Sequence, residues 1–487
     1  MTIVNAPDDA VVLRPPPPGE AIADVGAAVR DALRFPLSGD AIERLVRPGG
    51  YATIVAEPPA LPIPGSATAD PRQSAIAAVA DELARLGVPS ERQTIVVACG
   101  LGRRVSPREI GGLVSPEFRR RFRGRVIVHD AEDPDLVELG WAGNVPLKVN
   151  PALVETDLVV VVSAAETVLH GGPAALLGAS GTKALRAAGA FSLLETSGSQ
   201  GWRTALALEV ALTKRVPVTS ASLVLNHPRL GGALRGYPFS ADAGERISGS
   251  QLRRAFGLLP AGIRRLLMTS VSRELSAAAV FGGPPSVAHA EALIRAIEFR
   301  SAALDRPLDA ICIGIPPVTP YLPRERPNPV SVSYLGLGLA LRLWRNSFPV
   351  ADGGTAILLH GFNRRFAHPT QQPYRALFGS RHGRDPEAIA AAEAAAAVDP
   401  RGIDAYRRGR ACHPLLPFVE WDACEPALGR LGAVLVAGCR DATAARQFGF
   451  VPTQSIGAAL TMARGLAGDG ARIGFLLSPP YFPITVG

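Results

Sequence analysis

Short apolar runs alternate along the chain with longer segments in which apolar residues recur every three or four positions. The runs, such as QTIVVACG at 93–100 and TDLVVVVSA at 156–164, have the length and composition of strands that are buried on both faces. The intervening segments, such as SAIAAVADELARLG at 74–87, have the spacing of amphipathic helices. This alternation predicts an α/β fold with mostly parallel sheets that are covered by helices.

Two sets of these elements follow one another along the chain. The first set predicts strands at 51–57, 93–100, 125–132, 156–164 and 220–226, with helices at 74–87, 106–114 and 203–215. The second set predicts strands at 308–317, 353–362, 431–439 and 471–480, with helices at 386–398 and 455–470.

We therefore expect two α/β domains with a cleft between them, since substrates of such proteins commonly bind in a cleft at the carboxyl ends of strands. The expected organisation is a flexible tail at 1–20, an N-terminal domain at 21–265, a linker at 266–290 and a C-terminal domain at 291–487.

The composition and the N-terminal sequence argue against a membrane-spanning, a secreted and a disulfide-rich protein. No apolar run approaches the roughly 18 residues that span a bilayer, and the N-terminus lacks the basic start and apolar core of a signal peptide. We therefore expect a cytoplasmic protein with no membrane partner. The five cysteines form no C-x-x-C pair, which argues against a disulfide framework and against a structural zinc site.

The net charge of +8 is accompanied by one dense basic run, RRRFRGR at 119–125. No nucleic-acid recognition motif accompanies this run, so a solvated helix end is favoured over a phosphate-binding patch. We expect no nucleic-acid partner.

Lys183 stands out because only three of the 51 basic residues are lysines. It directly follows the glycine-rich turn GASGT at 178–182, between a predicted strand and a predicted helix. Such a turn can present backbone N–H groups to an anion. It is not a P-loop, because Thr182 and Ala184 stand where that motif needs Gly and Ser or Thr. The alternative is a surface lysine at the start of a helix.

In this region and beyond, the chain resembles the nickel-pincer lactate racemase family, whose enzymes invert 2-hydroxy acids. The resemblance is carried by HDAEDPDLVELGWAGNVPLKVNPALVETDLVVVVSAAE at 129–166, by SGTK at 180–183, by ASLVLN at 221–226 and by the closing segment from FGFVPTQ at 448–454 to FLLSPP at 475–480. It implies that Lys183 tethers a nucleotide-derived nickel cofactor covalently. It also implies that Gly178, Ser180 and Gly181 bind the phosphate of that cofactor.

The resemblance further implies hydride transfer assisted by two acid/base histidines and an arginine that holds the substrate carboxylate. Gly102, in GLGR at 100–103, stands where the first histidine is expected, and glycine cannot carry a proton. His170, in ETVLH at 166–170, is the candidate for the second. The alternative for His170 is a hydrogen-bonded loop residue.

The arginine position has two interpretations. Either Leu61 replaces the arginine, or the loop is longer and Asp70 and Arg72 are the displaced pair. In the second case Arg72 can clamp a carboxylate with two parallel hydrogen bonds. The nickel ligand is unknown, because the segment 190–202 holds no histidine and the next one along the chain is His227.

His129 lies near Asp130 and Asp133 at the end of a predicted strand. The three side chains suggest either a metal or proton-transfer cluster or, more simply, a strand-end histidine whose hydrogen bonds are satisfied.

Two functions remain open. The first is a racemase or epimerase that acts on a lactate-like 2-hydroxy acid through a nickel-pincer nucleotide tethered to Lys183, with His170 and Arg72 as catalytic residues. The second is a relative that keeps the fold as an anion-binding, small-molecule-binding or regulatory protein and does not racemise, because fold alone does not imply function.

Overall fold

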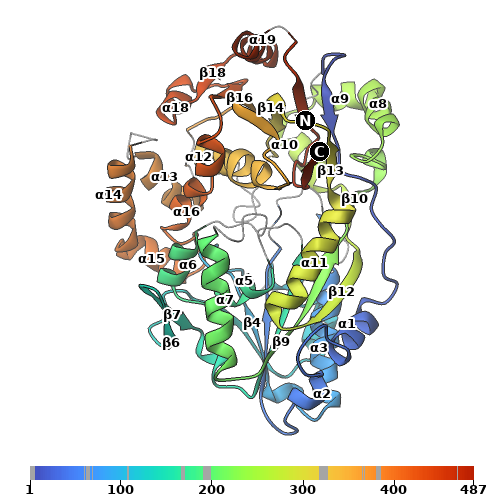
Figure 1. The fold of residues 1–487 in the computed structure, drawn as a ribbon, viewed down its shortest axis with the longest axis vertical. Helices are drawn as coiled ribbons and strands as arrows, with labels where there is room; N and C mark the ends of the chain where they lie inside the picture. The colour runs from blue at the N-terminus through green and yellow to red at the C-terminus, as the bar shows by residue number, and fades with distance from the viewer. Residues whose placement is uncertain are drawn as a thin grey trace.

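The computed structural model of this 487-residue chain describes residues 6–59, 61, 66–67, 70–106, 109–165, 171–189, 199–316, 327–364, 366, 368–379, 385–468 and 470–487. The molecule has two lobes, and each is built on a six-stranded sheet (Figure 1). The mixed α/β class with mostly parallel strands, which the apolar periodicity predicts, is confirmed.

The first sheet has five parallel strands and one antiparallel edge strand. Its central strands are buried on both faces because helices cover each side, which explains their continuous apolar sequence. In spatial order the strands are β12 (Ala277–Gly283), β9 (Val218–Leu225), β8 (Leu158–Ala165), β2 (Ala52–Ala56), β4 (Gln93–Val97) and β5 (Arg125–Val128).

The second sheet is entirely parallel. In spatial order its strands are β1 (Val11–Leu13), β19 (Ile473–Leu476), β14 (Leu308–Gly314), β16 (Val350–Leu359), β17 (Ala433–Ala437) and β18 (Val451–Thr453). Smaller sheets contain β10 (Arg229–Leu230), β11 (Ser272–Glu274) and β3 (Ser66–Ala67); β6 (Val137–Ala142) and β7 (Val145–Val149); and β13 (Ala302–Leu304), β20 (Ile484–Val486) and β15 (Trp344–Arg345).

The α-helices divide between the lobes in chain order. Those of the first lobe, including the segment 226–276 between β9 and β12, are α1 (Val25–Arg34), α2 (Ile42–Leu45), α3 (Pro71–Arg85), α4 (Pro116–Arg121), α5 (Pro173–Leu177), α6 (Thr182–Ala188), α7 (Gln200–Thr213), α8 (Ala241–Gly249), α9 (Gln251–Leu258), α10 (Ala261–Thr269) and α11 (Pro285–Arg300). Those of the second lobe are α12 (Pro329–Ser333), α13 (Gln372–Gly379), α14 (Pro386–Ala397), α15 (Pro400–Arg407), α16 (Leu416–Asp422), α17 (Glu425–Leu428), α18 (Ala442–Gln447) and α19 (Ile456–Ala467).

The structure differs from the sequence-based expectation in three segments. Among the described residues of the expected helix at 106–114, the helical part is a 3-10 helix at Glu109–Gly112. Residues 11–13, expected within a flexible tail, form β1 and pair with β19. The expected linker at 266–290 contains β11 and β12, and β12 is the sixth strand of the first sheet. β1 and β11 are short, and β12 lacks an alternation of polar and apolar residues. Their local sequence therefore does not indicate a strand, and each forms because it pairs with a strand that is distant in the chain.

The two lobes share one apolar core. Leu101, Ala165 and Val224 of the first lobe belong to the same cluster as side chains of the second. The second lobe contributes the segment 329–343, which is buried throughout and includes a π-helix at Tyr334–Leu339. The lobes are therefore held together by hydrophobic burial as well as by polar contacts.

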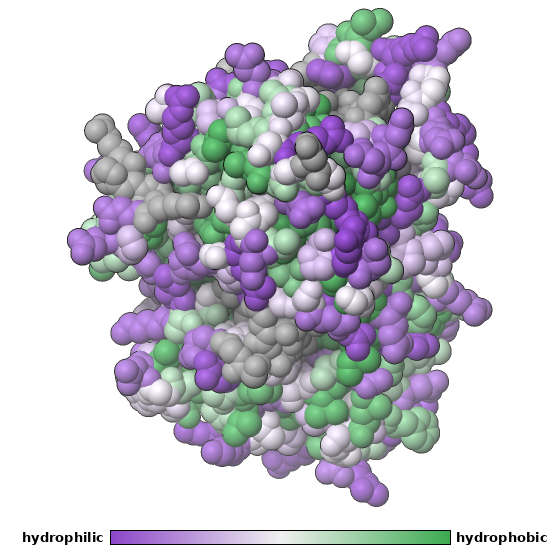
Figure 2. Space-filling view, turned by 45° about the horizontal axis from the view of Figure 1, so that its top comes forward, coloured by the Kyte–Doolittle hydropathy of each residue, from purple (hydrophilic) through white to green (hydrophobic). Residues whose placement is uncertain are grey.

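The surface seen in Figure 2 mixes hydrophilic and hydrophobic residues over both lobes. Within the residues that the structure describes, no helix has the length and apolar character needed to cross a membrane.

Candidate functional site

The carboxyl ends of β4 and β5 meet the turn at 178–182 that precedes Lys183. Gly100, which follows β4, donates its backbone N–H to the carbonyl of Gly178 at 2.9 Å. His129, which follows β5, contacts the carbonyl of Ser180 at 2.8 Å. The predicted cofactor turn therefore lies at the carboxyl edge of the first sheet, where α/β proteins place their ligands.

The backbone N–H groups of this turn are already used inside the protein. Five successive donors each lie 2.8–3.2 Å from a carbonyl oxygen. A phosphate held by a turn needs N–H groups that point outward without partners. The pairs are Gly178 with Ala174, Ala179 with Leu176, Ser180 with Leu177, Gly181 with Lys148 and Thr182 with Ala131.

Close packing explains the small residues of the turn. A Cβ atom on Gly178 would lie 3.0 Å from the carbonyl oxygen of Ala98, and one on Gly181 would lie 3.1 Å from Leu136. Ser180 is fully buried and donates its hydroxyl to the carbonyl of Leu177 at 2.6 Å. These three residues therefore have structural reasons for their identity that require no phosphate.

Lys183 is the second residue of α6, and its side chain is exposed. Its amine is therefore accessible for covalent attachment of a group. The described residues thus fit the tether that the resemblance implies, but the preceding turn does not fit a phosphate cradle. No cluster of three or more metal-binding side chains occurs among the described residues.

His129 is a buried, neutral histidine with both ring nitrogens engaged. Because the Ser180 carbonyl can only accept, Nε2–H donates to it, and Nδ1 accepts from the amide of Asn150 at 3.3 Å. Burial lowers the pKa of His129 to about 4. The stability that this histidine contributes is therefore present above about pH 6.5 and lost as the pH falls toward 4. The interpretation as a satisfied strand-end histidine is confirmed.

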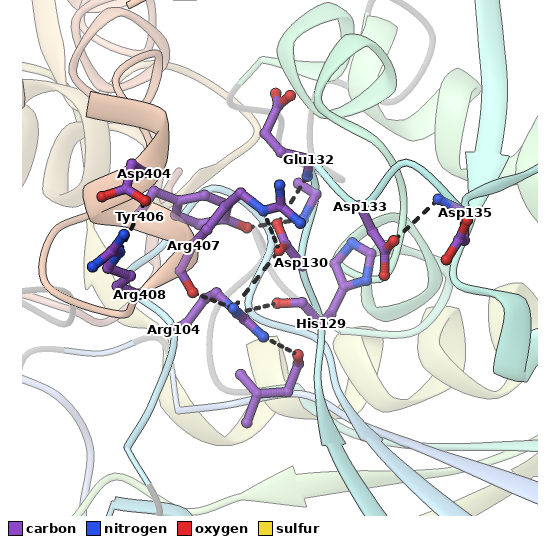
Figure 3. A network of polar contacts seen from close by, with 12 residues as sticks. Arg104, His129, Asp130, Glu132, Asp133, Asp135, Asp404, Tyr406, Arg407 and Arg408 are labelled. Atoms are coloured by element: carbon purple, nitrogen blue, oxygen red, sulfur yellow. Dashed lines mark hydrogen bonds and ion pairs between the residues drawn. The ribbon is translucent and has the colours of Figure 1, made fainter. Parts of the chain in front are cut away.

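A polar network joins this edge of the first lobe to α15 of the second lobe (Figure 3). Arg104 donates Nε–H to the carbonyl of His129 at 3.1 Å and also hydrogen-bonds to the carbonyl of Arg407. Arg407 in turn lies 3.1 Å from the carboxylate of Asp130. The hydroxyl of Tyr406 accepts from the N–H of Ala131 at 3.0 Å. The end of α15 is thereby fixed to the carboxyl edge of the first sheet.

Glu132 connects the start of α6 with the second lobe. Its Oε1 accepts from the hydroxyl of Thr182 at 2.5 Å and from Nε2–H of His413 at 3.1 Å. His413 is fully buried, and its Nδ1 accepts the N–H of Leu415 at 3.1 Å, which fixes the proton on Nε2. The hydrogen bond from His413 holds the pKa of Glu132 below its usual value. With both nitrogens engaged, His413 fixes the position of Glu132.

The turn that contains Gly102 is covered by Tyr406 and His413 of the second lobe. Gly100, Leu101 and Gly102 are buried, the Tyr406 hydroxyl donates to the carbonyl of Gly100 at 2.9 Å, and the N–H of His413 donates to the carbonyl of Leu101 at 2.9 Å. The position where the resemblance expects an acid/base histidine is therefore covered by the second lobe.

Arg72 forms a buried ion pair with Asp70 at the start of α3. Its Nε and Nη2 atoms lie 3.1 and 2.9 Å from the two carboxylate oxygens. Asp70 also accepts the N–H of Arg72 at 2.9 Å and so caps the helix.

His170 lies outside the described residues, which resume at Gly171. Gly171 and Gly172 pack directly against His289 of α11, since a Cβ atom on either would lie within 2.4 Å of that side chain. His227 follows β9 and is buried between the rings of Phe239 and Phe482, which lowers its pKa to about 3.

Sequence reasoning missed the residues of the second lobe that reach the site. Tyr406 and His413 come from a region with no recognisable motif, and their partners lie about 300 positions earlier in the chain. No local sequence signal identifies such residues.

A separate titratable group lies in the core of the second lobe. Glu420 of α16 is buried, and one carboxyl oxygen lies 3.1 Å from the hydroxyl of Tyr374. The other oxygen has no hydrogen-bond partner among the residues that the structure describes. Burial raises the pKa of Glu420 to about 8.

The raised pKa of Glu420 predicts a dependence of stability on pH. A carboxyl with a raised folded-state pKa stabilises the protein below its unfolded value of about 4.3, and this contribution is lost as the pH rises toward 8. Glu420→Gln is therefore expected to flatten the decline in the urea midpoint between pH 6.5 and 8. Glu117→Gln, in an exposed side chain of α4, is the control and should leave that decline unchanged. A decline that persists in Glu420→Gln would contradict the prediction.

Comparison with known proteins places the N-terminal part in a family and the whole chain in a fold. Residues 2–181 match a family model described as the lactate racemase N-terminal domain. The lactate racemase apoprotein from Thermoanaerobacterium thermosaccharolyticum matches with a TM-score of 0.61 and 15% identity, covering 99% of this chain and 96% of that one. A protein from Thermotoga maritima matches with a TM-score of 0.50 and 13% identity, covering 96% of this chain and all of that one. A comparison with curated protein sequences gives no significant match.

At these identities the structural likeness shows a shared fold, while the family model identifies the N-terminal part. Residues 2–181 thus match the lactate racemase N-terminal domain family, and the chain as a whole has the fold of a lactate racemase.

Proposed function

We propose that this chain has a racemase- or epimerase-type activity on a small 2-hydroxy acid and that Lys183 is the attachment point of a nickel-pincer nucleotide. The proposal is supported by the family match over residues 2–181 and by the fold. The observation that carries it is the exposed amine of Lys183 at the start of α6, beside the carboxyl edge of the first sheet.

When bound, the nickel-pincer group would supply the hydride acceptor. The residues of this chain would provide the anchor and a rigid frame: Glu132 holds Thr182, the residue before Lys183, and His413 holds Glu132. His170 and Arg72 remain the proposed proton-transfer and carboxylate-binding residues.

A specific observation favours a second candidate, a fold-retaining relative that binds a small molecule or acts as a regulatory protein and does not racemise. The N–H groups of 178–182 are engaged with carbonyls, and Gly102 stands buried where a histidine is expected. Both features remove parts of the site that racemisation needs.

Intact mass spectrometry tests the first candidate. The chain is co-expressed with the enzymes that build the cofactor, and an adduct of several hundred daltons is expected on the parent protein. Lys183→Ala should abolish the adduct. Lys214→Ala removes an exposed lysine after α7 and should retain it.

Loss of optical rotation with a single lactate enantiomer is measured on the same samples. An adduct that survives in Lys183→Ala would contradict the tether assignment. An unmodified parent chain without bound nickel would overturn the racemase proposal in favour of the second candidate.

A further inference from the structure

The connection between β9 and β12 is far longer than the first sheet needs. The two strands are antiparallel neighbours, and Leu225 pairs with Ala277. Such neighbours are commonly joined by two to five residues. Here residues 226–276 intervene, held at their base by the antiparallel pairing of β10 with β11. This insertion contains α8, α9 and α10, and α8 and α9 lie at the upper right of the molecule (Figure 1).

Two helices of the insertion expose large apolar side chains to solvent. None of the residues of α9 is buried, although three of its eight residues are leucine or phenylalanine. Ile263, Leu266 and Leu267 follow a three- and four-residue spacing that places them on one face of α10. The exposed fractions are 71% for Leu252, 88% for Leu258, 46% for Ile263, 65% for Leu266 and 45% for Leu267.

The same helices are rich in positive charge. Residues 251–269 contain four arginines and no aspartate or glutamate. Arg253, Arg254 and Arg264 form no ion pair with any carboxylate among the described residues. The segment therefore combines protruding aliphatic side chains with free guanidinium groups, as interfacial amphipathic helices do.

We propose that α9 and α10 dock this protein on an anionic lipid surface. A second copy of the chain would bring four further arginines against the first four, and that repulsion disfavours self-association through this surface. Leu252 and Leu258 are exposed by more than two thirds. The fluid acyl chains of a lipid layer can pack around such protruding side chains, whereas a protein partner would need a complementary pocket for each of them.

This surface is independent of Lys183 and of the proposed reaction. It adds a peripheral membrane contact, which departs from the expectation of no membrane partner. That expectation rested on the lack of a long apolar run, which a peripheral contact does not need.

Co-sedimentation of the full chain with vesicles tests the proposal. Binding is expected to vesicles of phosphatidylglycerol and phosphatidylcholine, and not to phosphatidylcholine alone. Raising the salt from 0.1 to about 1 M should release the protein, because the screening length falls from about 10 to about 3 Å. Each arginine removed should lower the partition coefficient about fivefold, so that Arg253→Gln with Arg254→Gln lowers it about 25-fold.

Matched variants outside the insertion serve as controls. Leu258→Ser with Leu266→Ser should abolish vesicle binding, whereas Leu466→Ser, in a 62% exposed residue of α19, should not. Arg119→Gln with Arg120→Gln removes two charges from α4 and should leave binding unchanged. Circular dichroism establishes that every variant folds.

Failure of the parent chain to sediment with anionic vesicles would overturn the proposal. Equal binding to neutral vesicles would do the same. A dimer in solution that is lost in Leu258→Ser with Leu266→Ser would reassign the surface to self-association.

Discussion

Arg72→Ala is expected to lower the free energy of unfolding by about 3–5 kcal/mol, the range for removing one member of a buried ion pair. Arg72 is 2% exposed and Asp70 is 6% exposed, and two hydrogen bonds join their charged groups. The substitution leaves the Asp70 carboxylate buried without its cation. Urea unfolding monitored by circular dichroism measures the change as a shift in midpoint at constant slope.

An exposed pair provides the matched control for Arg72. Arg121 and Asp81 also form a two-point ion pair, but their side chains are 55% and 50% exposed. Arg121→Ala should therefore cost less than about 1 kcal/mol. Equal losses in the two variants would show that the Arg72 pair is not buried as the structure has it.

The same variant informs the proposed role of Arg72 in substrate binding. If Arg72 only stabilises the fold, the folded fraction of Arg72→Ala binds a 2-hydroxy acid as tightly as the parent chain does. If it also clamps the carboxylate, affinity falls as well. Isothermal titration below the unfolding midpoint separates the two outcomes.

Gly172→Ala is expected to destabilise the protein by about 2–6 kcal/mol, combining about 1–3 kcal/mol of backbone strain with about 1–3 kcal/mol of overpacking. Gly172 has φ 55° and ψ −125°, a conformation that L side chains rarely adopt. A Cβ atom there would lie 2.4 Å from Cβ of His289 and 2.9 Å from the carbonyl of Pro285. These atoms belong to the start of α11 and cannot move without displacing it. Thermal unfolding of the variant measures the loss.

Gly189 separates the two contributions. It has nearly the same backbone conformation, with φ 59° and ψ −153°, and no atom of the described residues lies within 4 Å of the position that an added methyl group would take. Gly189→Ala should therefore show the strain alone, about 1–3 kcal/mol. If both variants lost the same stability, the close contact between an added methyl group at Gly172 and His289 would contribute nothing to the loss.

The strands were the part of the fold that sequence reasoning predicted best. Predicted runs at 93–100 and 156–164 correspond to β4 and β8, because a strand buried on both faces needs a continuous apolar sequence whatever its neighbours are. The edge strands β1 and β12 escaped prediction. Their pairing with β19 and β9 depends on residues far away in the chain, so no local sequence pattern predicts it.

The candidate site was predictable only in part. The turn before Lys183 could be singled out by its glycines and by its resemblance to the lactate racemases. The sequence could not show that the backbone N–H groups of this turn are already hydrogen-bonded, since the acceptors include the carbonyls of Lys148 and Ala131 as well as those of the preceding helix. His413 lies 281 positions from Glu132, and nothing near it in the sequence indicates that contact.

By itself, the sequence determined the α/β class, most strand positions and the identity of Lys183 as the residue to test, because these follow from local periodicity and from a contiguous motif. Only the tertiary structure decided that the N–H groups of 178–182 are engaged, that His129 is neutral and satisfied, and that α15 covers the turn at Gly102. The reason is physical: a backbone donor or a buried imidazole is free or satisfied according to which distant atoms fold against it.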